Sequence, residues 1–253
     1  MKDSTSRFSD RVENYIKYRP DYPAQVLEFL KSDCGLTSDS LIADIGSGTG
    51  ISTRLFLENQ NTVYGVEPNA EMRQAAEKFF KDNPHFHSVN ATAEQTHLPG
   101  DLFDFVSAGQ AFHWFDHEQA KFEFQRILKP QGWVVLLWNE RKLDTTPFLV
   151  AYEKMLLDFA TDYQEVNHTQ ITHADFTQFF APHPLHTHTL PNSQTFDFEA
   201  LKGRLLSSSY CPNEGQPGYD SMISRLQEIF AEYQTEGSVL FEYNTTLFYG
   251  HLR

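Results

Sequence analysis

The chain has 253 residues, of which 40% are hydrophobic and 14% aromatic, so it is long enough to bury the core of one α/β domain. Its formal net charge of −14 repels a phosphate backbone, which argues against a nucleic-acid partner. No apolar run approaches the roughly 18 residues of a membrane span, and the N-terminus lacks the apolar core of a secretory signal. We therefore expect a cytoplasmic protein with no membrane partner.

Residues 41–139 alternate short apolar runs with amphipathic stretches, a pattern typical of β-α-β units and a mostly parallel sheet. The predicted strands are 41–45, 62–67, 85–90, 103–109 and 132–139. Helices are expected at 23–31 and from near Gly50, Asn69 and Asp116. Asn69 is a predicted N-cap and Asp116 is predicted to begin a second helix, because apolar residues recur at helical spacing after each of them.

Beyond residue 140 the patterns are weaker and predict a cap. The predicted elements are helices at 147–160, 198–208 and 219–235 and strands at 185–190 and 240–251. The two late strands would close the far edge of the sheet as an antiparallel pair. The expected fold is α/β, a doubly wound, mostly parallel seven-stranded sheet with a helical cap. We expect one domain over 1–253, with the core in 8–140 and the cap and sheet-completing strands in 141–253.

A glycine-rich turn after the first predicted strand is the sharpest feature of the sequence. Gly46, Gly48 and Gly50 lie between that strand and a helix, where the backbone can approach a ligand closely. Glu67 ends the next strand, where a carboxylate can accept hydrogen bonds from both hydroxyls of a ribose. The structural alternative is a tight turn beside a surface glutamate.

A nicotinamide-dependent oxidoreductase is the nearest enzymatic alternative, because dinucleotide folds share the strand, the turn and a later acidic residue. Their fingerprint is G-x-G-x-x-G, whereas this turn runs G-x-G-x-G and places Ile51 at the last position. Asp44, two residues before the first glycine, has no part in that fingerprint. Both departures favour an adenosyl ligand without a pyrophosphate.

The run Asp44-x-Gly46-x-Gly48-x-Gly50 resembles motif I of class I S-adenosylmethionine-dependent methyltransferases, which have a Rossmann-like fold. The likeness continues in Val-Glu-Pro at 66–68, Ala93-Glu94 and the turn 128–132, where Gln131 departs from a common glycine. The segments 15–23 and 110–115 are similar to small-molecule methyltransferases that include trans-aconitate and juvenile hormone acid methyltransferases. The specific match covers the first 140 residues.

The resemblance implies S-adenosyl-L-methionine as cofactor and assigns roles to particular residues. Gly46, Ser47 and Gly48 would pass under its methionine part, Asp44 would hold the turn or the methionine ammonium, and Glu67 would bind the ribose. Pro68 would cover the adenine, with Ala93 and Glu94 at the adenine edge. Arg19 would bind the methionine carboxylate, with Tyr15 folding over it and Gln110 joining the cofactor site. The alternative for the N-terminal segment is packing alone.

The acceptor side of the expected site contains His113 and Trp114, directly after the fourth predicted strand. His113 is either a general base or a wall residue beside Trp114, because an ionised carboxylate acceptor has no proton to remove. A small molecule is the expected acceptor, with a carboxylate as one candidate. The remaining functional alternative is a protein that binds the cofactor without catalysis, and the oligomeric state stays open.

No metal site is expected from the sequence. His183, His186 and His188 have no carboxylate or cysteine nearby and are interpreted as a strand with outward histidines. Cys34 and Cys211 form no Cys-x-x-Cys pair and are interpreted as core or surface residues.

Overall fold

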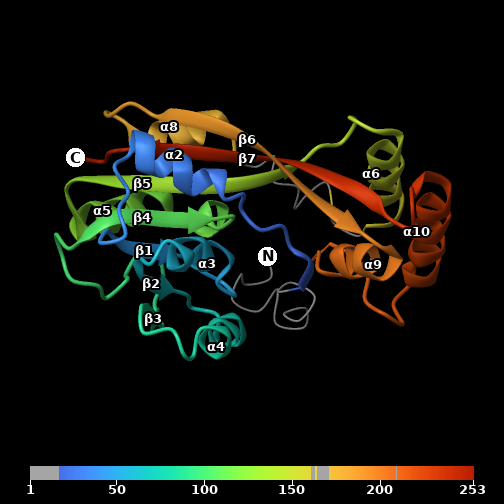
Figure 1. Cartoon of the computed structure of the whole chain (residues 1–253), viewed down its shortest axis with the longest axis horizontal. Helices are drawn as coiled ribbons and strands as arrows, with labels where there is room; N and C mark the ends of the chain where they lie inside the picture. The colour runs from blue at the N-terminus through green and yellow to red at the C-terminus, as the bar shows by residue number, and fades with distance from the viewer. Residues whose placement is uncertain (1–16, 161–162, 164–170, 209) are drawn as a thin grey trace.

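The computed structural model describes residues 17–160, 163, 171–208 and 210–253. These residues form a seven-stranded sheet with the order β3-β2-β1-β4-β5-β7-β6 (Figure 1). The strands are β1 (Leu41–Ile45), β2 (Thr62–Val66), β3 (Phe86–Val89), β4 (Phe103–Gly109), β5 (Leu128–Arg141), β6 (His186–Phe196) and β7 (Val239–Gly250). The chain order reverses between β1 and β4, which is where open α/β sheets bind ligands.

Strands β1 to β5 are parallel, so their carboxyl ends meet at one edge of the sheet. Strand β1 is buried on both faces, with Ile42 and Ala43 pointing into different cores. This explains its near-continuous apolar sequence. Strand β7 runs antiparallel between β5 and β6, and its burial alternates along its length.

Helices cover both faces of the sheet. One face packs against α2 (Gln25–Asp33), α3 (Ile51–Glu58) and α4 (Ala70–Phe79), and the other against α5 (His117–Ile127) and α8 (His173–Phe180). The side chain of Asn69 accepts a hydrogen bond from the Met72 N–H, and that of Asp116 accepts one from the Gln119 N–H. The predicted N-cap at Asn69 and the predicted helix start at Asp116 are therefore confirmed.

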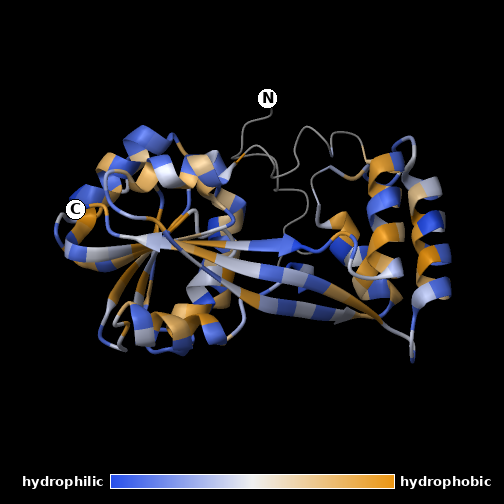
Figure 2. Ribbon diagram, turned by 90° about the horizontal axis from the view of Figure 1, so that it is seen from above, coloured by the Kyte–Doolittle hydropathy of each residue, from blue (hydrophilic) through white to orange (hydrophobic). Residues whose placement is uncertain are grey.

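A helical cap lies at the far end of the long strands β6 and β7, which extend beyond the core toward it (Figure 2). It contains α6 (Pro147–Phe159), α9 (Phe198–Leu206) and α10 (Tyr219–Tyr233). These helices share a second hydrophobic core with the ends of the strands, in which Phe241 and Tyr243 of β7 are almost fully buried. Cap and core are thus joined by continuous strands.

The predicted fold class is confirmed, and most predicted elements lie within a few residues of those observed. One difference is α8, which the sequence did not predict and which packs against α5 in the core. Another is β5, which begins at Leu128 because the 129–132 segment forms a bulge within the strand. Gln131 in this bulge has φ of +67°, a conformation that favours glycine.

Candidate active site

The glycine-rich turn brings the backbone of three residues to the carboxyl end of β1. The N–H groups of Gly46 and Ser47 both donate to the Val66 carbonyl, at 2.8 and 3.1 Å, which fixes the turn against β2. Gly46, Gly48 and Gly50 have φ of +67°, +57° and +93°. A Cβ on Gly46 would lie 2.6 Å from the Ala111 Cβ, so this position excludes every side chain.

Glu67 lies directly beside this turn, at the carboxyl end of β2. It is only 7% exposed, its Oε2 accepts from the Gly48 N–H at 2.8 Å, and its Oε1 accepts from the Asn69 N–H at 2.8 Å. Burial raises the pKa of the Glu67 carboxyl above its ordinary value, although both N–H groups and Arg73 oppose the change. Glu67 is therefore a fixed carboxylate rather than a mobile surface side chain.

Asp44 is fully buried behind the turn. Its Oδ2 accepts hydrogen bonds from Ser52 Oγ at 2.8 Å and Thr53 Oγ1 at 2.6 Å, both in the first turn of α3. Its Oδ1 forms no hydrogen bond of good geometry with the residues that the structure describes, although the Ser107 hydroxyl lies close enough to lower the pKa of the carboxyl. Burial raises the pKa of the Asp44 carboxyl to about 6, with the Glu67 carboxylate adding to the effect. One oxygen thus holds the turn, and the other has unused accepting capacity.

Gln110 continues the carboxyl edge beyond β4. It has φ of +54°, and its amide forms two hydrogen bonds with the backbone of Asn139, accepting from the N–H at 2.7 Å and donating to the carbonyl at 3.2 Å. The Asn139 side chain donates to the Pro20 and Asp21 carbonyls, both at 3.3 Å, and accepts from Thr245 Oγ1 at 2.5 Å. Gln110 and Asn139 therefore tie the N-terminal segment to the ends of β4, β5 and β7.

The N-terminal segment from Lys17 to Tyr22 crosses from the sheet edge to the cap. The Tyr22 hydroxyl lies 2.6 Å from the position that a Cβ on Gly109 would take, at the end of β4. Arg19 Nη2 donates to the Ser207 carbonyl at 3.0 Å, at the end of α9. Tyr15, the other residue expected to fold over the cofactor, lies outside the described residues.

The three residues expected around an adenine follow β2 and β3. Pro68 is partly buried, and its carbonyl lies 3.4 Å from Arg73 Nη1. Ala93 is 5% exposed, whereas Glu94 is partly exposed and accepts from the Asp116 N–H at 2.9 Å. The side chain of Glu94 thus binds the start of α5.

His113 and Trp114 lie in a short 3-10 helix, Phe112–Trp114, after β4. The His113 ring centroid is 4.6 Å from that of Trp114 and 5.4 Å from that of Trp138 on β5. Trp114 is 38% exposed. The imidazole therefore contacts two indole rings next to the carboxyl edge.

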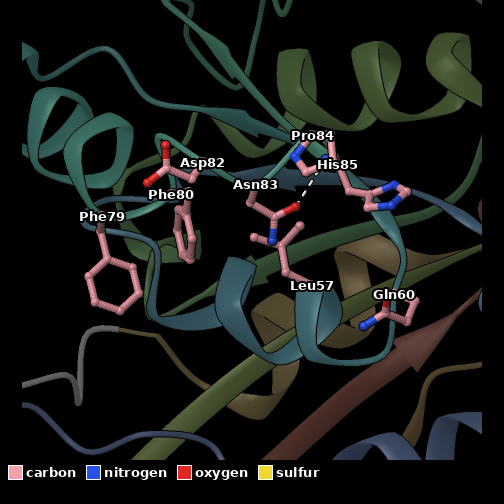
Figure 3. A pocket seen from close by; sticks show the side chains of 8 residues that line it. All are labelled: Leu57, Gln60, Phe79, Phe80, Asp82, Asn83, Pro84 and His85. Carbon is pink, nitrogen blue, oxygen red and sulfur yellow. Dashed lines mark hydrogen bonds between the residues drawn. The ribbon is translucent and has the colours of Figure 1, made fainter.

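A surface pocket of about 500 Å³ lies elsewhere, between the carboxyl ends of α3 and α4 and the loop before β3 (Figure 3). It is lined by Leu57, Gln60, Phe79, Phe80, Asp82, Asn83, Pro84 and His85. Gln60 and His85 lie just before β2 and β3, so this part of the pocket is at the amino edge of the sheet. Phe80, which also lines the pocket, packs against Gly50 of the glycine-rich turn.

No group of three or more histidine, cysteine or acidic side chains is arranged to hold a metal ion in the described part of the chain. No helix in the same residues is long and apolar enough to cross a membrane.

Sequence reasoning missed the polar groups that support the predicted residues. Ser52 and Thr53 hold Asp44, and their signal was available because both hydroxyls follow the turn within one helical turn of α3. Asn139 and Asn192 bind the carbonyl of Asp21, and no local pattern marks them. They meet only through the register of β5, β7 and β6.

Known proteins resemble this chain in sequence and in fold. Residues 43–136 match the methyltransferase domain family. An uncharacterised methyltransferase of Schizosaccharomyces pombe is 33% identical over 135 residues, which cover 53% of each chain. The chain thus spans about half the length of the curated relatives it matches.

Solved structures extend the likeness in fold to nearly the whole chain. A protein of Anaeromyxobacter dehalogenans described as a type II methyltransferase superposes with a TM-score of 0.65 at 18% identity, over 93% of this chain and 98% of that one. A phosphoethanolamine N-methyltransferase of Haemonchus contortus, solved with S-adenosylhomocysteine, gives a TM-score of 0.54 at 15% identity, over 95% of this chain and 57% of that one.

The sheet order, the glycine-rich turn and the buried glutamate define a Rossmann-like methyltransferase fold. Residues 43–136 match the methyltransferase domain family, and the fold is that of class I methyltransferases, whose cofactor is S-adenosylmethionine. The residues present fit that cofactor. The turn at Gly46 leaves no space for a Cβ, and the buried oxygen Asp44 Oδ1 can accept a further hydrogen bond.

Proposed function

We propose that the chain catalyses transfer of the methyl group of S-adenosylmethionine to a small-molecule acceptor. The observation that carries the proposal is the rigid placement of Glu67 beside the turn at Gly46 to Gly48. A carboxylate fixed by two N–H groups loses little conformational entropy when it binds a further pair of hydroxyls. When bound, the cofactor supplies an electrophilic methyl group on a sulfonium.

We infer that Glu67 accepts hydrogen bonds from the ribose hydroxyls, and that the backbone of Gly46, Ser47 and Gly48 lies against the methionine part. Asp44 Oδ1 would accept from the methionine ammonium while Oδ2 holds α3, which combines the two roles expected for this residue. Pro68, Ala93 and Glu94 would surround the adenine. Glu94 would bind the adenine through its backbone, since its side chain already accepts a hydrogen bond from the Asp116 N–H.

Arg19 is our proposed partner for the methionine carboxylate, with Tyr15 covering the same group. Support comes from the path of the segment 17–22, because the side chains of Asn139 and Asn192 donate hydrogen bonds to backbone carbonyls of this segment and hold it at the carboxyl edge of the sheet. Gln110 would act indirectly, by setting the position of Asn139 and therefore of this segment. It would orient the cofactor site rather than form its surface.

For His113 we favour the role of a wall residue that positions the acceptor beside Trp114. Its ring lies against two indoles, which suits orientation and exclusion of water. The alternative is a general base, which a phenol or protonated amine acceptor would need and a carboxylate would not. If His113 is a general base, His113→Gln should lower the turnover of the enzyme by a factor of about 10² to 10⁴ while its affinity for the cofactor is retained.

Incubation with isotopically labelled S-adenosylmethionine and a metabolite extract, followed by mass spectrometry, tests the proposed function. We expect one small molecule to gain the labelled methyl group and an equal amount of S-adenosylhomocysteine to form. Binding of the cofactor without any labelled product across the extract would identify a non-catalytic binding protein. Quenching of nicotinamide fluorescence on binding would instead favour an oxidoreductase.

A further inference from the structure

The cap contains a buried and a largely buried arginine, Arg204 and Arg141, of which only Arg141 pairs with a carboxylate. Arg141, at the end of β5, forms an ion pair with Glu153 of α6 through its Nη2. Arg204 on α9 is only 7% exposed and forms no ion pair with any residue that the structure describes. A guanidinium stays protonated at neutral pH, so this cluster has a positive charge without a partner.

The hydrogen bonds of Arg204 are long and go only to neutral groups. Its Nε donates to Tyr243 Oη at 3.3 Å, and its Nη1 donates to Ser208 Oγ at 3.2 Å and to Ser207 Oγ at 3.5 Å. The hydrogen bonds from the Arg204 guanidinium to described residues come from Nε and Nη1, and none comes from Nη2. The Nη1 of Arg141 is buried without an acceptor among the described residues.

The aromatic groups around the two guanidinium groups do not offset the charge. Burial raises the pKa of the Tyr152 phenol well above its ordinary value, so this group is neutral at physiological pH. Arg141 Cζ lies 5.2 Å from the Tyr152 ring centroid, and Arg204 Cζ lies 5.8 Å from that of Phe241. Such ring contacts attract a cation weakly and leave its hydrogen-bond donors unsatisfied.

The position of Arg204 connects it to the proposed methyl-transfer site. Its neighbour Gly203 packs under Tyr18, since a Cβ there would lie 2.0 Å from the Tyr18 ring. Ser207, which accepts from Arg204, also accepts from Arg19 through its carbonyl. Helix α9 lies next to the first described residues of the chain, on the side of the cap that faces the core (Figure 1).

We propose that Arg204, supported by Arg141, binds an oxyanion of the methyl acceptor, either a carboxylate or a phosphate. This inference rests on the proposed function and names the chemical class of its acceptor. Buried charges in proteins are paired, and the planar fork of a guanidinium matches a two-oxygen anion.

The net charge of the chain adds to this argument. At −14, the molecule as a whole repels anions, so an anionic acceptor needs a local cationic site to bind. A buried guanidinium provides such a site, because salt screens it less than it screens an exposed charge. The acidic surface and the buried cation together would favour an anion that fits the cap over bulk anions.

Thermal unfolding at constant ionic strength with added sodium succinate, sodium phosphate or neutral succinamide tests the proposal on the whole chain. We expect succinate or phosphate, but not succinamide, to raise the melting temperature of the wild type, and the stronger of the two identifies the anion class. Arg204→Met should abolish this response. It should not lower the melting temperature without anion, because it removes an unpaired buried charge. Arg225→Met, at an exposed ion pair on α10, is the matched control and should respond as the wild type does.

The proposal is overturned if no anion stabilises the wild type, or if Arg204→Met responds to anions as the wild type does. If Arg204→Met does not fold, Arg204→Lys serves instead, since it keeps the charge but loses the fork. We expect it to weaken the anion response at least tenfold in concentration, and an unchanged response contradicts the proposal.

Calorimetry with S-adenosylmethionine on the same variants separates this inference from the proposed function. Arg204→Met should bind the cofactor with wild-type affinity, because Arg19 is assigned to the cofactor carboxylate. If the affinity of Arg204→Met for S-adenosylmethionine is tenfold lower, Arg204 binds the cofactor, and the proposed acceptor site is overturned. If the wild type does not bind the cofactor, the proposed function fails while the anion response can still be observed.

Discussion

Gly46 combines a left-handed backbone conformation with a crowded position in the turn. Gly46→Ala would combine a left-handed φ with a Cβ 2.6 Å from that of Ala111. The conformation costs about 1 to 2 kcal/mol and the overlap about 1 to 3 kcal/mol more. We therefore expect a loss of about 2 to 5 kcal/mol in the free energy of unfolding, measured by denaturant titration.

Gly215→Ala provides the matched control for this prediction. Gly215 has φ of +80°, but a Cβ there would meet nothing within 4 Å. Its substitution should cost only the conformational part, about 1 to 2 kcal/mol. Equal losses in the two variants would show that the turn at Gly46 is less crowded than the structure indicates.

The raised pKa of Asp44 predicts that the stability of the fold depends on pH. Its pKa is about 6 in the folded protein, against an ordinary value near 4, so the folded state binds more protons than the unfolded state between these values. The contribution of Asp44 to the free energy of unfolding should therefore fall as the pH rises from about 4 to 6, and level off above. Asp44→Asn should remove this dependence, since an amide does not titrate and its oxygen can still accept from Ser52 and Thr53.

Denaturant titration of both proteins across this pH range gives the difference curve. A flat difference between wild type and Asp44→Asn contradicts the raised pKa. The same variant tests the second role of Asp44, because loss of a charged partner for the methionine ammonium should weaken cofactor binding about tenfold. Unchanged cofactor affinity would restrict Asp44 to holding the turn.

At the scale of elements, the network centred on Asn139 holds the segment 17–22 against the sheet. We predict that Asn139→Ala speeds tryptic cleavage after Lys17 in the ligand-free protein, because the Pro20 and Asp21 carbonyls lose a common donor. Limited proteolysis followed by mass spectrometry measures the rate. S-adenosylmethionine should slow cleavage in the wild type, as expected if Arg19 gains a partner.

Asn83→Ala is the control for this prediction, since Asn83 lies at the opposite edge of the sheet and its side chain binds the His85 N–H. Cleavage after Lys17 should be unaffected by it. If Asn139→Ala and Asn83→Ala are cleaved at the wild-type rate, the network does not restrain the N-terminal segment.

The elements that the sequence predicted are those whose signals are local. The cap at Asn69, the helix start at Asp116 and the glycine turn at Gly46 each depend on a few neighbouring residues, and the structure has all three at these positions. Helix α8 was missed because its eight residues include three buried aromatic side chains and one exposed face too short to show a period. Its packing against α5 determines its position.

At the scale of the whole molecule, the acceptor region could not be predicted because it is assembled from distant parts of the chain. Arg141, Arg204 and Tyr243 lie 39 or more residues apart and meet through the pairing of β5 with β7 and the packing of α9. Sequence analysis assigned this region only to a cap. The cofactor side, by contrast, depends on the carboxyl ends of consecutive parallel strands, whose juxtaposition follows from the fold class.

Glu67 is central to the account, because its buried side chain holds the glycine-rich turn and is also the proposed partner of the cofactor ribose. Calorimetric titration of the wild type, Glu67→Ala and Glu67→Gln with S-adenosylmethionine and S-adenosylhomocysteine tests this assignment most directly, with Glu58→Ala, at an exposed site on α3, as control. We predict that both ligands bind Glu67→Ala about ten- to a hundredfold more weakly, a loss of about 1.5 to 3 kcal/mol. Glu67→Gln should lie between, and Glu58→Ala should match the wild type. Wild-type affinity for both ligands in a folded Glu67→Ala variant would contradict the account.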